Sequence, residues 1–154
     1  MAAKFFKRSS GVRLVARIFP HYRSLDGVEA AVWLMFACGI WITWSTRDRR
    51  VLFVYSNSPN WKEYIEQRIL PRLPANTVIM NWSERKKWSQ LSLPVRAFHY
   101  FCGDVNCNPA AVVFRPFRVA KTFRLWQPFR DYKHGKAEPL VKVEREMFDY
   151  IETK

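Results

Sequence analysis

The chain has 154 residues and a formal net charge of +13, and 49% of its residues are hydrophobic and 16% aromatic. This composition excludes an intrinsically disordered chain, because it supplies ample apolar surface for a folded core. Three cysteines exclude a disulfide framework. The positive charge favours anionic partners, namely lipid headgroups, acidic proteins or, as the less favoured class, nucleic acid.

Residues 1–26 read as a basic amphipathic leader. Between Gly11 and Pro20, the arginines Arg13 and Arg17 share one helical face, and apolar side chains share another. Such a segment suits the surface of an anionic bilayer. It equally resembles an organelle-targeting presequence, which is rich in arginine and poor in acids. The sequence leaves both interpretations open.

An uncharged apolar run from Ala30 to Ser45 predicts one transmembrane helix over residues 27–46. The run is apolar on every face, Trp41 and Trp44 stand at its end, and arginines follow it. The run is short for a span, so a buried core helix and a segment lying in the membrane plane are the alternatives. We therefore expect a single-pass membrane protein that contacts membrane lipid and other membrane-protein subunits.

Residues 47–154 predict a small α/β domain, because short β-branched or aromatic runs alternate with helical patterns. Asn-x-x-Glu at Asn60 and at Asn81 resembles the capping box that starts a helix. In the last helix an apolar stripe alternates with Glu144, Glu146 and Asp149, which we expect to face water. The expected strands are 51–55, 77–80, 97–101, 110–114 and 121–126, and the expected helices are 60–70, 81–88 and 139–151.

This order of elements resembles the thioredoxin-like fold over residues 51–152. The resemblance rests on the opening strand Val51–Tyr55, on Pro109 directly before an apolar run, and on the closing helix. It implies a cis peptide bond at Asn108-Pro109. The family's redox cysteine pair would stand at the start of the first helix, where this chain has Ser56-Asn57-Ser58-Pro59-Asn60-Trp61. The resemblance therefore implies the fold without its dithiol chemistry.

Aromatic and basic residues recur together between Phe114 and Lys136. The aromatic residues of this segment are spaced by multiples of three, and a basic residue often follows each of them. A period of three fits neither helix nor strand, so Pro116 and Pro128 are expected to break the segment. Arginine beside aromatic rings suits phosphate, bases or lipid headgroups, although an aromatic core with solvated charges explains the pattern too. The candidate residues for an anionic partner are Arg115, Arg118, Lys121, Arg124, Trp126, Arg130, Lys133 and His134.

The leading functional hypothesis is a membrane-anchored, non-enzymatic interaction module or accessory subunit with a basic aromatic surface. The chain has no glycine-rich phosphate loop and no metalloprotease or hydrolase motif, and we expect no metal site and no cofactor. One alternative is a transferase or hydrolase that holds a phosphate with Arg115, Arg124 and Arg130 and moves protons with His134. The other is a thiol redox protein that uses Cys102 and Cys107.

Overall fold

The computed structural model describes residues 35, 38–39, 42–44, 50–103, 107–115 and 120–153. The chain forms two compact units, residues 1–39 and residues 40–154. The basic leader expected over residues 1–26 lies outside the described residues. The sheet and the helices that cover it belong to the second unit.

The transmembrane helix expected over residues 27–46 is a wrong prediction. In the described part of the chain, no helix combines the length and the apolar character that a membrane crossing requires. The end of the apolar run has another use, because Trp44 is only 2% exposed and meets Phe114 edge-on at 4.5 Å between ring centroids. A tryptophan expected at a bilayer interface is therefore part of a protein core.

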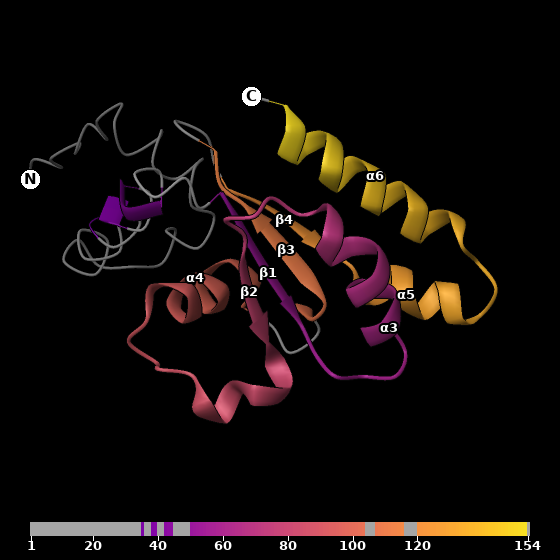
Figure 1. Cartoon of the computed structure of the whole chain (residues 1–154), viewed down its shortest axis with the longest axis horizontal. Helices are drawn as coiled ribbons and strands as arrows, with labels where there is room; N and C mark the ends of the chain where they lie inside the picture. Colours follow the sequence, from indigo (N-terminus) through magenta and orange to yellow (C-terminus); the bar gives the residue numbers. More distant parts are fainter. Residues whose placement is uncertain are drawn as a thin grey trace, which may run out of the picture. The chain divides into compact units, whose positions relative to one another are not determined.

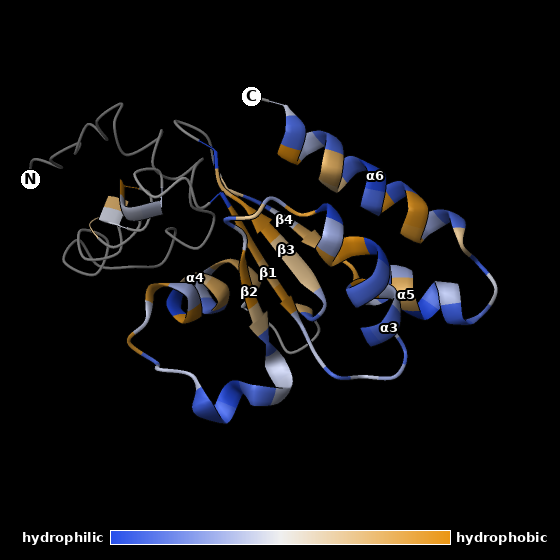
Figure 2. Cartoon of the chain, in the orientation of Figure 1, coloured by the Kyte–Doolittle hydropathy of each residue, from blue (hydrophilic) through white to orange (hydrophobic). Residues whose placement is uncertain are grey.

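The centre of the domain is a four-stranded mixed sheet with the strand order β2-β1-β3-β4 (Figure 1). β1 (Val51–Tyr55) pairs in parallel with β2 (Val78–Asn81) and antiparallel with β3 (Ala110–Val113), which pairs antiparallel with β4 (Lys121–Arg124). All of β1 and β3 is buried, as their unbroken apolar runs predict, and both strands are hydrophobic in Figure 2. The peptide bond between Asn108 and Pro109, directly before β3, is cis. The small α/β domain is confirmed.

One face of the sheet carries the main core. It is covered by α3 (Lys62–Tyr64) with the continuing turns η2 (Ile65–Ile69) and η3 (Leu70–Arg72), and by α5 (Trp126–Lys133) and α6 (Glu138–Glu152). Figure 1 shows these helices together on the same side of the strands. The core beneath them contains Phe53, Ile65, Phe123, Phe129, Leu140 and Met147.

The other face is covered by α4 (Leu93–Cys102), where the sequence predicted a strand over 97–101. Pro94 stands in the first turn of this helix, where its missing N–H costs no hydrogen bond, and Gly103 ends it with φ of 58°. Val95, Ala97, Phe98 and Cys102 form the buried stripe. The strand prediction is wrong because five mostly apolar residues fit a buried strand and a buried helix equally well.

The two predicted capping boxes have different outcomes. Before η4 (Trp82–Lys87), the Asn81 side chain accepts a hydrogen bond from the N–H of Ser83 at 3.0 Å, so this cap is confirmed. Asn60 does not cap, because α3 begins two residues later and its N-cap position is Trp61 with no side-chain hydrogen bond. Pro128 does not break the chain either, since it lies in the first turn of α5.

Candidate functional site

Four of the predicted binding residues lie along α5 and at its C-cap. Trp126, Arg130 and Lys133 follow the spacing i, i+4 and i+7, which places them on one helical face, and His134 follows directly as the C-cap residue. The Arg130 guanidinium carbon lies 5.2 Å from the centre of the Trp126 ring, and Arg130, Lys133 and His134 are exposed. We call these four residues the α5 basic face.

The side of α5 next to this face fixes the helix to the core. Phe129 is 1% exposed, and its ring centroid lies 5.4 Å from that of Tyr64 and 6.2 Å from that of Trp61. The aromatic residues of the predicted period of three thus divide between core and surface: Phe114, Phe123 and Phe129 are buried, and Trp126 is half-buried. The α5 basic face is therefore held in place by the packing of the neighbouring Phe129.

Two further predicted residues lie on β4 and point to opposite faces of the sheet. The Lys121 ammonium lies 4.7 Å from the centre of the Phe123 ring and 5.0 Å from that of Tyr150, on the side of α6. Arg124 is an odd number of residues away, so its side chain leaves the strand on the α4 side, where its charge acts on Cys102. The structure does not bring these two residues onto one surface.

Arg115 is engaged at the end of α6. Its guanidinium donates to the backbone carbonyls of Tyr150, at 2.6 Å, and of Thr153, and it lies 3.9 Å over the Tyr150 ring. The last carbonyls of a helix lack intrahelical donors, so a cation here completes the helix terminus. Arg118, the remaining predicted residue, lies outside the described part of the chain.

The structure does not bring together the three arginines that were expected to hold a phosphate in the enzyme alternative. Arg115 binds the α6 terminus, Arg124 lies on the α4 face of the sheet, and Arg130 lies on α5. His134, the proposed proton carrier, is exposed in the turn after α5. The three arginines thus belong to three separate surfaces of the described domain.

Cys102 and Cys107 form a buried pair of thiols that are not joined in a disulfide. Cys102 ends α4 and is 2% exposed, and Cys107 precedes the cis proline and is 0% exposed. A hydrogen bond between the two thiols, burial, and the negative charge that Cys107 would carry all raise the pKa of Cys102. Since the thiolate is the reactive form, this environment suppresses thiol chemistry in the folded state.

The turn after β1 uses its polar groups in internal hydrogen bonds. The Trp61 indole N–H donates to Ser56 Oγ at 3.2 Å, the Asn57 N–H donates to Ser83 Oγ at 2.9 Å, and the Asn81 amide donates to Asn57 Oδ1 at 2.8 Å. These bonds tie the end of β1 to the end of β2. Their geometry is that of a structural turn.

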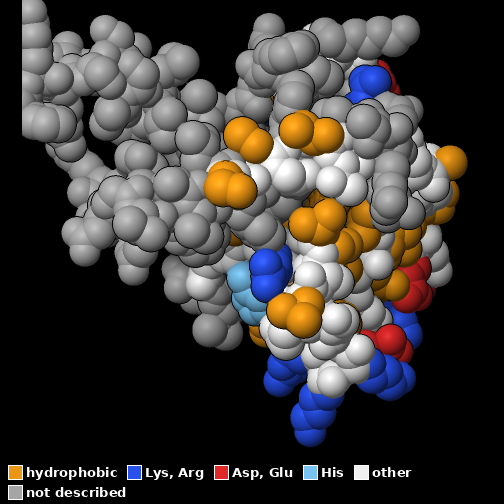
Figure 3. All heavy atoms as spheres, turned by 90° about the vertical axis from the view of Figure 1, so that its left-hand side faces the viewer, with side chains coloured by type: hydrophobic (Ala, Val, Ile, Leu, Met, Phe, Trp, Pro, Cys, Tyr) orange, Lys and Arg blue, Asp and Glu red, His pale blue; other side chains and the backbone are white. Residues whose placement is uncertain are grey.

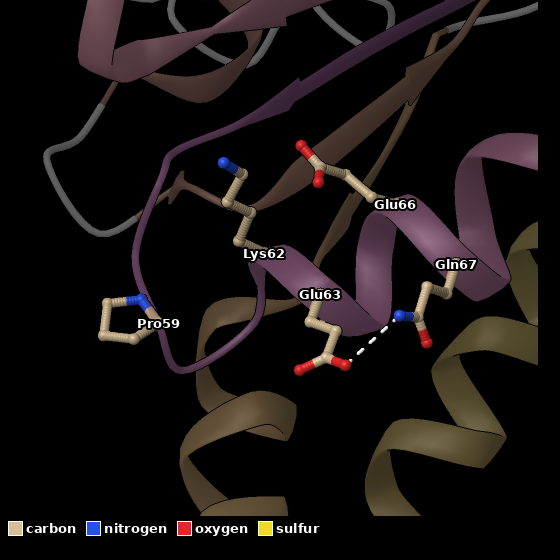
Figure 4. Close-up of a pocket in the computed structure, with 5 residues that line it drawn as sticks. All are labelled: Pro59, Lys62, Glu63, Glu66 and Gln67. Atoms are coloured by element: carbon tan, nitrogen blue, oxygen red, sulfur yellow. Dashed lines mark hydrogen bonds between the residues drawn. The ribbon is translucent and has the colours of Figure 1, made fainter.

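A shallow surface hollow of about 280 Å³ lies beside this turn (Figure 4). Its carboxylates already have partners: Glu63 accepts from the Gln67 amide at 3.1 Å, and Glu66 accepts from the Tyr55 hydroxyl at 3.1 Å. The hollow is open to solvent, and the Tyr55–Glu66 bond ties η2 to β1 while the Glu63–Gln67 bond lies within the helical segment. The residues around it are Pro59, Lys62, Glu63, Glu66 and Gln67.

The structure also shows a surface that sequence reasoning missed, built by η4 and the loop that leads to α4. Arg85, Lys86 and Lys87 are consecutive exposed residues between Trp82 and Trp88. Figure 3, which faces the left side of Figure 1, shows Lys and Arg side chains grouped at the lower end of this side. The available signal was three adjacent cations enclosed by two tryptophans, an arrangement typical of an interface.

Comparisons with known proteins add no assignment. No family model matches the chain, and no curated protein and no solved structure matches it either. Within the described residues, no three histidine, cysteine or acidic side chains are grouped so that they could hold a metal ion. The function is therefore argued from the surfaces themselves.

Proposed function

We propose that this protein is a non-enzymatic interaction module, an accessory subunit that binds an acidic segment of a protein partner through the α5 basic face. The observation that carries the proposal is the exposure of Arg130 and Lys133 beside Trp126 on one face of α5, with His134 exposed at the C-cap of the helix. The charge of this face is complementary to carboxylates. Its tryptophan adds apolar contact area next to the charge.

The chemistry of these side chains supports an acidic peptide as the partner. Arginine presents a planar set of donors that matches a carboxylate in two parallel hydrogen bonds. Arg130 lies over the Trp126 ring, which restricts its conformations before binding. Tryptophan and arginine are also the residues that most often dominate binding energy at protein interfaces.

The fold proposed for this module is thioredoxin-like without a redox site. Supporting it are the element order, with β1 and β2 separated by helical turns and β3 and β4 followed by helices, and the place of Pro109 directly before β3. The turn after β1 carries serine, asparagine and proline where the family has cysteines. A fold of this kind presents surface helices on a rigid sheet, which suits a binding role.

The test is a titration of the full chain with a fluorescently labelled, glutamate-rich peptide, followed by anisotropy. Reversing two charges of the α5 basic face in R130E/K133E should weaken binding more than tenfold, because both attractions become repulsions. The matched control is K142E/R145E, which makes the same change of net charge at exposed positions of α6. Equal losses in both variants would mean that net charge alone attracts the peptide, and the proposed site would be wrong.

A further inference from the structure

A second exposed surface of the domain combines cations with an unprotected apolar side chain. Arg85, Lys86 and Lys87 are exposed on η4, and Leu91 in the following loop is 77% exposed. Figure 2 shows this part of the domain as hydrophilic along η4, with a short hydrophobic stretch in the chain directly before α4. A single exposed leucine is common on protein surfaces, so the informative feature is the position of Leu91 close to three consecutive cations.

Aromatic packing holds this loop in place. The Trp82 ring centroid lies 5.7 Å from that of Trp88 and 5.3 Å from that of Phe98, and Trp88 lies 6.0 Å from Phe98. Phe98 is 3% exposed on the buried side of α4, so it anchors both indoles to the domain. The cations and Leu91 are therefore displayed on a supported loop.

We propose that η4 and the loop to α4 form a docking site for an anionic phospholipid bilayer, with Leu91 inserted among the acyl chains. The three cations would contact lipid phosphates and carboxylates, and Trp82 and Trp88 would lie near the headgroup level that indoles prefer. Glu84 is the one acid of η4, and its nearest contact with Lys87 is a 3.9 Å ion pair, so the segment stays strongly basic. Charge complementarity selects the anionic leaflet.

Two observations favour a bilayer over a nucleic acid. The indole of Trp82 already contacts Trp88, Phe98 and the Arg85 guanidinium, which lies 5.2 Å from its centre, so its surface is committed to neighbours. A base that stacks needs an open ring face. Leu91, at the same surface, has no hydrogen-bonding group for a base but fits hydrocarbon well.

The experiment is co-sedimentation of the full chain with phosphatidylcholine vesicles, with and without phosphatidylserine. The native chain should bind the phosphatidylserine vesicles more tightly, and raised salt should weaken this binding. In R85Q/K86Q/K87Q the affinity should fall on the order of a hundredfold, since each cation near such a surface contributes about fivefold. Leu91→Ser should lower it by about tenfold, and Leu91→Trp should restore or increase it.

The matched control is K136Q/K142Q/R145Q, which removes the same charge at exposed positions after α5 and on α6. The proposal would be overturned if the affinity for phosphatidylserine vesicles fell equally in both triple variants. It would also be overturned if neither Leu91 substitution changed that affinity. Stronger binding to single-stranded RNA than to the vesicles, lost in the η4 variant, would also overturn it. R130E/K133E should leave Leu91-dependent vesicle binding in place, so this proposal and the α5 binding function fail independently.

Discussion

The two faces of the sheet use their aromatic residues differently. On the face covered by α3, α5 and α6, Phe123 and Phe129 are buried and bring together segments distant in sequence. On the α4 face, Trp82 and Trp88 are only half-buried and support a short, charged surface segment. The first arrangement stabilises the fold, and the second displays a surface. Substitutions of aromatic residues on the face covered by α3, α5 and α6 should therefore mainly lower stability. Substitutions on the α4 face should lower stability less and affect binding more.

The largest expected effect is on stability, at Phe129. Phe129→Ala removes a ring that is 1% exposed and contacts Trp61 and Tyr64, so the free energy of unfolding should fall by about 4 kcal/mol. Trp82→Ala, at a half-buried ring of the other face, should lower it by about half as much. Urea unfolding measures both. Similar losses would contradict the division between a stabilising and a displaying face.

A smaller effect is expected at Glu144, which the sequence placed in water and the structure buries. Its carboxylate accepts from the Tyr64 hydroxyl at 2.8 Å and from the Arg72 guanidinium, which lies 3.8 Å over the Phe148 ring. Glu144→Ala would leave both donors without this acceptor, so the free energy of unfolding should fall by about 2 kcal/mol. The control Glu146→Ala, exposed on α6, should change it by less than about 0.5 kcal/mol.

The smallest effect is expected at alkaline pH. Burial and the hydrogen bond to Glu144 raise the pKa of Tyr64 to about 12, above the unfolded value of 10.0. The folded state therefore holds this proton more tightly, so the contribution is complete below pH 10 and is lost as the pH rises towards 12. Phenolate absorbance should show a tyrosine titrating late, and Glu144→Ala should move that titration to lower pH. An unchanged titration in this variant would contradict the coupling.

Much of the fold could be predicted because its signals are local. Val51–Tyr55 and Ala110–Val113 are apolar runs bounded by turn residues, and the last helix shows a clear apolar stripe. α4 was missed because the apolar residues 97–101 also fit a short buried strand, and Pro94 in front of them does not by itself indicate a helix. A proline is common in the first turn of a helix, and only the packing of Phe98 on the tryptophans decides between the two.

The residues of the candidate site were predicted, but not the helix that brings them together. A strand was expected over 121–126 and no helix directly after it, because the period of three masked the i, i+4, i+7 spacing of Trp126, Arg130 and Lys133 on α5. Arg115 could not be assigned, because the carbonyls that it binds come from Tyr150 and Thr153, far along the chain. Glu144 was wrongly expected to face water for the same reason, because its partner Arg72 lies 72 residues earlier in the chain. The periodicity of a sequence does not show which residues far apart in the chain contact each other.

The strand order also leaves the sheet with two unlike borders. β4 ends the sheet on one side, and its exposed Lys121 and Arg124 discourage a foreign strand from pairing there by repulsion and by the cost of desolvating a charge. β2 ends it on the other side with Val78, Ile79, Met80 and Asn81, all uncharged, and Ile79 is 49% exposed. Resistance to self-association is therefore built into one border by charge, whereas the other depends on a strand of only four residues being too short a template.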